Sequence, residues 1–234
     1  MKVFTWIGRG LVYGLGGLAL AFVLVQAWFF GWVLYWSSYD PKTTNFMERR
    51  LDELRARQPK AQLKHQWVPY DRISPNLKRA VVAAEDARFL DHEGFDWEGI
   101  QRALEKNQQR GKPVAGGSTI SQQLAKNLFL SGDRSFVRKG QEALITLMLE
   151  QTMSKRRILE LYLNVAEWGE GVFGAEAAAR HHYGVSAAQL TPAQAARLAA
   201  MLPRPRVYDR NRGSHCLAAY ADRILGRMPS AQVT

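Results

Sequence analysis

The 234-residue chain contains one cysteine, Cys216, so a disulfide bond within the chain is excluded. An oxidising compartment is therefore neither required nor ruled out. Cys216 lies in a segment that contains alanine and leucine, and we expect it to be a small core residue. The chain also has no internal repeat, no low-complexity tract and no convincing pattern of alternating strands. The absence of alternating strands favours a mainly α-helical body.

Acidic residues are the scarcer charged class, with 21 Asp and Glu against 32 Lys and Arg. The resulting net charge of +11 indicates an anionic partner, such as nucleic acid, anionic lipid head groups or a phosphorylated substrate. Nucleic acid is disfavoured, because the basic residues are interleaved with acidic ones and no nucleic-acid-binding motif is present.

Charged side chains are absent from residues 10–39. A membrane-spanning helix needs roughly 20 apolar residues, so this stretch can cross a bilayer. Lys2 and Arg9 precede it, and the positive-inside rule then places the N-terminus in the cytoplasm and the rest of the chain outside. Aromatic residues gather at the far end of the stretch, as at a membrane interface, and they are Trp28, Trp32, Tyr35, Trp36 and Tyr39.

Two alternatives to a retained anchor exist for this stretch. Val25-Gln26-Ala27 resembles the cleavage site of a signal peptide, although the apolar residues continue well beyond it. A buried core helix is disfavoured, because no polar face appears over this length. We therefore expect a short N-terminal segment over 1–9, an uncleaved anchor over 10–39, a polar connection over 40–66 and one domain over 67–234.

A carboxylate interrupts the apolar stripe of a helix that we expect to begin at Ser74-Pro75. Glu85 lies one turn after Val81, where a core would favour a methyl group. A buried carboxylate needs a basic partner or has a raised pKa, and both are frequent at active sites. Glu85 is therefore a candidate catalytic residue, and a structural ion pair is the alternative. The stripe recurs at helical spacing and comprises Leu77, Val81, Ala84 and Phe89.

Two glycines precede another helix start. Gly116-Gly117 allows a tight turn, and Thr119 and Gln122 have capping-box spacing. A helix N-terminus of this kind offers N–H groups to a phosphate, although an ordinary helix start is the simpler interpretation. Lys126 and Arg134 nearby strengthen the anion-site interpretation.

A second carboxylate, Glu142, lies in a helix predicted over 134–150. Arg138 lies one turn before it, and the alternative is an exposed ion pair worth only ~0.3–0.5 kcal/mol. Two carboxylates on separate helices suit glycosyl transfer, in which one removes a proton while the other stabilises charge or positions a group. Lys126, Arg134 and Arg138 suit a pyrophosphate leaving group, and a membrane anchor suits a lipid-linked donor.

Further helices are expected along most of the remaining chain, with a loop marked by Gly169, Gly171 and Gly174. The expected ranges are 48–57, 95–107, 155–167, 175–183, 192–202 and 214–228.

Four segments resemble the motifs of the peptidoglycan glycosyltransferases, glycosyltransferase family 51, between about Trp67 and Pro205. The first is Glu85-Asp86-x-x-Phe89-x-x-His92-x-Gly94, and the second, which is very specific, is Gly116-Gly117-Ser118-Thr119-Ile120-Ser121-Gln122-Gln123-Leu124-x-Lys126-Asn127. The third is Arg138-Lys139-x-x-Glu142, and the fourth is Lys155-x-x-Ile158-Leu159-Glu160-x-Tyr162-Leu163-Asn164. No Lys-Thr-Gly motif of a transpeptidase follows, so the chain is similar to the family's monofunctional members.

The resemblance implies a mainly α, lysozyme-like glycosyltransferase domain preceded by one N-terminal transmembrane helix. It implies polymerisation of lipid II into β-1,4-linked glycan strands, with inversion at the sugar and release of undecaprenyl pyrophosphate. Glu85 matches the general base that deprotonates the acceptor 4-hydroxyl, and Glu142 matches the second catalytic Glu, near the donor pyrophosphate. Phe89, Phe95 and Trp97 either belong to the core or enter the outer leaflet beside the site. The positions that match substrate contacts are Ser118, Gln123, Lys126, Arg134 and Arg138.

The implied partners are lipid II, the growing glycan strand and membrane lipid, and cell-wall synthesis or division proteins are compatible with them. The implied location is the bacterial cytoplasmic (inner) membrane, with the catalytic domain on the periplasmic or outer side. A divalent cation such as Mg²⁺ is compatible with departure of the pyrophosphate, but no dedicated metal site is visible. His92 has no second His or Cys at ligand spacing, and we expect it to order its loop through hydrogen bonds.

Two other functions are considered. A lysozyme-like hydrolase or lytic transglycosylase would act on finished glycan and would need an acid to protonate the leaving oxygen, but no phosphate-binding cations. A membrane-anchored binding protein with a basic face would have no need of Glu85 or Glu142.

Overall fold

The computed structural model describes residues 2–112, 116–130, 132 and 135–234, with side chains described from residue 12 onward. The chain divides into two compact units, one ending at Tyr39 and the other covering Asp40–Thr234.

The first unit is a single helix, α1 (Lys2–Ser38). Its apolar part, Val12–Ser38, is long enough to cross a membrane by length and composition. The helix continues without a break through Val25-Gln26-Ala27. Within it, Trp32 packs on Tyr35 and Trp36, and Tyr35 stacks on Tyr39 just beyond the helix end.

The second unit is mainly helical, as expected. Most of its longer helices begin after a Ser or Thr whose hydroxyl accepts a hydrogen bond from a backbone N–H in the first turn, which satisfies a donor that the helix itself leaves unpaired. These caps are Thr44, Ser74, Thr119, Ser135, Ser154 and Thr191. The helices are α2 (Asn45–Arg55), α3 (Pro75–Glu85), α4 (Trp97–Arg110), α5 (Ile120–Phe129), α6 (Phe136–Thr152), α7 (Lys155–Val165), α8 (Ala175–Tyr183), α9 (Pro192–Met201), α10 (Pro205–Arg210) and α11 (His215–Arg227), with 3-10 turns at Tyr70–Arg72, Ala187–Gln189 and Met228–Ser230.

The strands were missed by the sequence analysis. A three-stranded sheet of order β1-β3-β2 joins β1 (Lys64–His65), β2 (Glu167–Gly169) and β3 (Val172–Phe173). Strands β2 and β3 lie where a glycine-marked loop was expected, and β1 lies in the expected polar connection. Strands of two or three residues are too short to show alternation, and β2 and β3 are buried at every position, which removes the polar half of the pattern.

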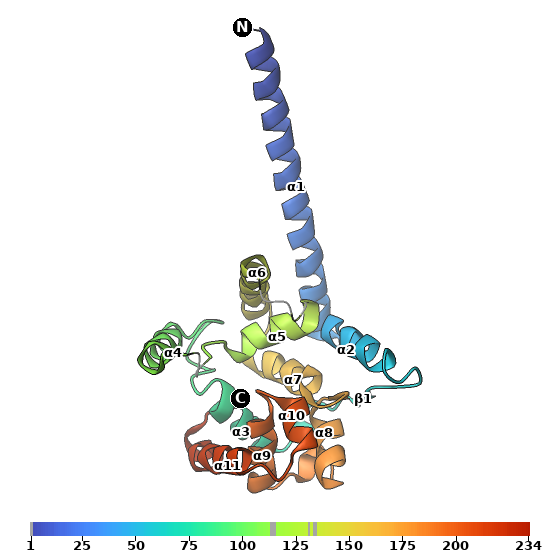
Figure 1. Cartoon of the computed structure of the whole chain (residues 1–234), viewed down its shortest axis with the longest axis vertical. Helices are drawn as coiled ribbons and strands as arrows, with labels where there is room; N and C mark the ends of the chain where they lie inside the picture. The colour runs from blue at the N-terminus through green and yellow to red at the C-terminus, as the bar shows by residue number, and fades with distance from the viewer. Residues whose placement is uncertain (1, 113–115, 131, 133–134) are drawn as a thin grey trace. The chain divides into compact units, whose positions relative to one another are not determined.

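Helix packing places α5 centrally in this unit, against α2, α6 and α7, while α3, α9 and α11 pack together at another side (Figure 1). The largest fully buried side chains include Trp168, Tyr162 and Phe173. Burial of one large apolar side chain contributes about 1.5–3 kcal/mol, so these residues fix the helices to one another. The buried alanines of α9 allow its close approach to α3 and α11.

One further expectation was wrong. Cys216 is exposed, because it lies on the outer side of α11 while Leu217 beside it is buried. Pro205 occupies the first turn of α10, where its fixed φ suits a helix and its missing N–H costs nothing.

Candidate functional site

The segment after α3 is tied to the start of α5 by one buried carboxylate. Asp86 Oδ2 accepts a hydrogen bond from Ile120 N–H at 3.0 Å, and Asp86 Oδ1 lies 2.9 Å from His92 Nε2. The other ring nitrogen of His92 accepts from Gly94 N–H, so Nε2 is the nitrogen that donates to Asp86. Thr119 Oγ1 donates to Gly94 O. These bonds hold the first motif against the second, and they confirm that His92 orders its loop through hydrogen bonds.

Glu85 is the last residue of α3, so the carboxylate stands at a helix end. The expected stripe is correct for Leu77 and Val81, whereas Phe89 lies beyond the helix and reaches the core from the following turn. Glu85 Oε2 accepts a hydrogen bond from Gln123 Nε2 at 2.7 Å. Burial raises the pKa of Glu85, and the hydrogen bond from Gln123 and the charge of Lys126 only partly offset it. Among the described residues, the hydrogen-bond partner of the Glu85 carboxylate is an amide and no cation is bonded to it, so with its raised pKa it is suited to accept a proton.

Glu142 is 3 % exposed and is paired with two cations of its own helix. Arg138 Nη1 lies 2.5 Å from Glu142 Oε2, and Lys139 Nζ contacts Glu142 Oε1. Lys139 Nζ also lies 3.3 Å from Ser118 Oγ, which links α6 to the second motif. The expected Arg138–Glu142 pair is therefore confirmed, but it is buried rather than exposed.

Lys126 connects the two carboxylates electrostatically. Burial lowers the pKa of this lysine, while the charges of Glu142 and Glu85 both act to raise it, and Arg138 and Lys139 act to lower it. The surroundings of Glu142 thus carry more positive than negative charge. Such a cluster can bind a dianionic or trianionic group without a further cation.

The N-terminus of α5 is less available to an anion than its glycines suggested. Ile120 N–H donates to Asp86, and Gln122 N–H donates to Thr119 Oγ1 in the expected capping box. These two N–H groups therefore stabilise the loop, and side-chain cations remain the main anion-binding groups.

The structure brings most of the predicted site residues into two adjoining groups. Glu85 and Gln123 form one, and Ser118, Glu142 and Arg138 form the other, with Lys126 acting on both. Arg134 lies outside the described residues. Lys139 was not predicted as a site residue, although its spacing of three from Glu142 on a helix was a usable signal.

Of the three aromatic residues considered for the membrane, Phe89 belongs to the core, since it is 1 % exposed. Trp97 is 72 % exposed and stacks on Phe95, with ring centroids 5.5 Å apart. Contact of Trp97 with lipid stays a prediction.

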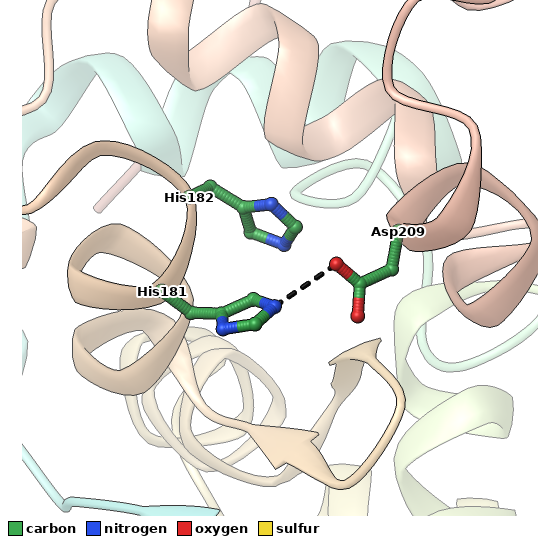
Figure 2. Close-up of side chains that lie close together, drawn as sticks. All are labelled: His181, His182 and Asp209. Carbon is green, nitrogen blue, oxygen red and sulfur yellow. Dashed lines mark hydrogen bonds and ion pairs between the residues drawn. The ribbon is translucent and has the colours of Figure 1, made fainter.

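A separate cluster joins α8 to α10, where side-chain atoms of His181, His182 and Asp209 that could hold a metal ion lie within 4.8 Å of one another (Figure 2). These atoms already have protein partners. His181 Nε2 lies 2.9 Å from Asp209 Oδ1, and His182 Nε2 donates to the Trp168 carbonyl at 3.0 Å.

Positive charge also surrounds Asp209. Arg212 Nη2 lies 2.7 Å from its Oδ1, and Glu170 N–H donates to its Oδ2. Although burial alone would raise the pKa of Asp209, the bonds from Arg212, His181 and Glu170 N–H lower it to about 2. We therefore interpret this cluster as an ion-pair network that joins α8, α10 and the β2–β3 turn.

Gly94 of the first motif has a positive φ of 92°, which favours glycine. A Cβ there would lie 2.8 Å from Cγ2 of the buried Thr146 and 3.1 Å from Cγ of Glu150. Gly94→Ala is therefore expected to lower the melting temperature strongly, because overpacking adds about 1–3 kcal/mol to the backbone strain. Gly111→Ala is the matched control, since Gly111 also has a positive φ but no atom within 4 Å of its Cβ position. Equal shifts for the two variants in thermal unfolding would contradict the packing argument.

Glu85→Gln is expected to stabilise the fold at neutral pH. A group whose pKa is raised on folding contributes its full stability below the unfolded pKa of about 4.3, and that contribution is lost as the pH rises through the folded pKa. The variant should therefore melt above the wild type at pH 7 and close to it at pH 4. Glu176→Gln is the control and should lower the melting temperature, because Glu176 accepts from Ala187 N–H and pairs with Arg180. Destabilisation by Glu85→Gln at pH 7 would show that Glu85 is a structural partner.

Comparison with known protein families gives the class to which this helical domain belongs. A family model described as Transglycosylase matches residues 51–229, which include all four motif segments.

Full-length relatives agree with this class. A biosynthetic peptidoglycan transglycosylase of Dechloromonas aromatica (strain RCB) is 63 % identical over 227 residues, covering 97 % of this chain and 98 % of the relative. A protein of the same name from Azoarcus sp. (strain BH72) is 62 % identical over 231 residues, covering 99 % of this chain and 98 % of the relative. The chain therefore belongs to the transglycosylase family.

Proposed function

We propose that this chain polymerises lipid II into β-1,4-linked glycan strands and releases undecaprenyl pyrophosphate. The relatives are named biosynthetic peptidoglycan transglycosylases, and family membership extends that class of activity to this chain. The observation that carries the finer proposal is the arrangement of Glu85, with its raised pKa, next to the cations around Glu142.

In the proposed reaction, Glu85 accepts the proton of the acceptor sugar's 4-hydroxyl. The freed oxygen attacks the anomeric carbon of the donor, the new glycosidic bond forms, and the bond between that carbon and the pyrophosphate oxygen breaks. The pyrophosphate leaves with the bonding electrons, and the anomeric configuration inverts.

The cation cluster is proposed to bind this leaving group. Lys126, Arg138 and Lys139 can stabilise the charge that develops on the pyrophosphate, and Glu142 holds the last two in place. Both oxygens of Glu142 are already occupied by these cations, so the residues present do not suit a divalent metal at Glu142. We therefore assign no step to a metal ion.

We also propose that α1 anchors the enzyme in the bacterial cytoplasmic membrane as a single span, with the second unit on the outer side. The apolar stretch Val12–Ser38 and its aromatic end support the membrane anchor. Such an anchor would keep the enzyme at the membrane that holds a lipid-linked donor. The proposed activity is glycosyl transfer without transpeptidation, as in the monofunctional members that the four motif segments resemble.

The proposal is tested by giving the purified full chain either labelled lipid II or finished glycan strands. Glycan polymer and lipid pyrophosphate from lipid II, with no fragments from finished strands, would support a synthetic transglycosylase. Sugar fragments from finished strands, without lipid pyrophosphate, would instead support the lytic alternative.

A further inference from the structure

A chain of two hydrogen bonds connects the buried core of α7 to Glu85. Tyr162 Oη donates to Gln123 Oε1 at 2.9 Å, and Gln123 Nε2 donates to Glu85 Oε2 at 2.7 Å. Tyr162 is 1 % exposed, so its ring is held by packing on every side. Gln123 lies on α5, which packs against α7, and its amide joins the tyrosine hydroxyl to the carboxylate.

The donor and acceptor in each of these two hydrogen bonds follow from the chemistry of the three side chains. A glutamine amide can rotate by half a turn and exchange its oxygen and nitrogen, and only one of the two orientations donates to a carboxylate. The Tyr162 hydroxyl remains protonated, because burial, and then the charges of Glu85 and Asp86, raise its pKa well above the usual value. The ionised Glu85 carboxylate only accepts, so it favours the orientation in which the amide nitrogen faces it, and the Tyr162 hydroxyl stabilises the same orientation by donating to Gln123 Oε1.

We propose that Tyr162 is a positioning residue, which fixes the Gln123 amide so that the amide always donates to the Glu85 carboxylate. The Tyr162 hydroxyl bonds Gln123, and Gln123 bonds Glu85, so Tyr162 acts through Gln123. This inference rests on the proposed role of Glu85 as general base, and it gives Gln123 a function besides substrate contact.

Loss of the tyrosine hydroxyl would remove one of the two bonds that orient the amide, so the bond that Gln123 donates to Glu85 would become weaker and less well aligned. That bond lowers the pKa of the carboxylate, so the pKa of Glu85 would rise further. The other groups that act on Glu85 are Lys126 of α5, Asp86 next to it in the chain and Tyr220 of α11, and they are unchanged by this substitution.

The first test measures Glu85 directly, without substrate. The pKa of the Glu85 carboxyl is followed by NMR in carbon-13-labelled full chain in detergent, and its signal is assigned with Glu85→Gln. Tyr162→Phe, which keeps the ring, should raise this pKa. Tyr70→Phe is the matched control, because Tyr70 is also buried and its hydroxyl bonds Thr234 instead. An unchanged Glu85 pKa in Tyr162→Phe would overturn the proposal.

The second test uses lipid II polymerisation over a range of pH. Tyr162→Phe should lower kcat by about threefold to tenfold, leave KM nearly unchanged and move the acid limb of the profile to higher pH. Adding the substitution to Gln123→Ala should have no further effect, whereas additive losses would show that Tyr162 does not act through Gln123. If the wild type fails to polymerise lipid II, the proposed function fails, but the NMR result still decides the role of Tyr162.

Discussion

Replacing Glu85 by Gln is expected to leave lipid II binding close to that of the wild type and to lower polymerisation by about 10²–10⁴-fold. The amide has nearly the same shape as the carboxylate and can still bond Gln123, but it cannot accept the acceptor's proton. The check is a pair of measurements on one preparation, namely lipid II affinity and initial rate of polymerisation.

A buried glutamate outside the site provides the control for this variant. Glu176→Gln should lower stability while leaving the rate per folded molecule unchanged, because Glu176 bonds only Ala187 and Arg180 in the described part of the chain. If both variants polymerise normally, Glu85 is not the base. If both lose activity in proportion to their folded fraction, the effect of Glu85→Gln is structural.

Lys126→Met is expected to reduce catalytic efficiency by about tenfold to a hundredfold. A charge-assisted hydrogen bond to the pyrophosphate contributes roughly 1.5–3 kcal/mol, and Met keeps most of the side-chain volume while removing the charge. The loss should be smaller for a donor analogue that lacks a phosphate group. The measurement is kcat/KM for lipid II, with the melting temperature of the same sample.

Lys78→Met is the matched control for this substitution. Lys78 is also a buried lysine, with a pKa lowered by burial, but its ammonium group lies over the Tyr70 ring, 3.9 Å from the centroid. It should leave kcat/KM unchanged. Equal kinetics for Lys126→Met and the wild type would remove Lys126 from the phosphate role.

Part of the site was predictable because several of its contacts join residues that are close together in the sequence. The capping box of Thr119 and Gln122 and the ion pair of Arg138 with Glu142 depend on spacings of one helical turn, and the helix start at Ser74-Pro75 depends on neighbouring residues. Spacing alone is enough for such contacts, since a helix places residues three and four apart on one face.

Contacts between distant segments could not be predicted in this way. The bond from Gln123 to Glu85 depends on how α5 packs against the end of α3, and so does the use of the Ile120 N–H by Asp86. Whether burial or a nearby cation controls the pKa of Glu85 was open from the sequence, because the answer depends on distances. In the structure burial dominates and the pKa is raised.

The short strands and the exposure of Cys216 were missed for a related reason. A strand of two residues has no period, and a residue on an alanine-rich helix has no clear inner side until its neighbours are known.

The central claim, that Glu85 accepts the proton during glycan synthesis, is tested most directly by comparing two pH titrations of the wild-type full chain. One is the carbon-13 titration of the Glu85 carboxyl, and the other is the acid limb of kcat/KM for lipid II polymerisation. The account predicts that both midpoints coincide and lie above the ordinary glutamate value of about 4.3. Full activity at a pH where the Glu85 carboxyl is protonated would contradict it.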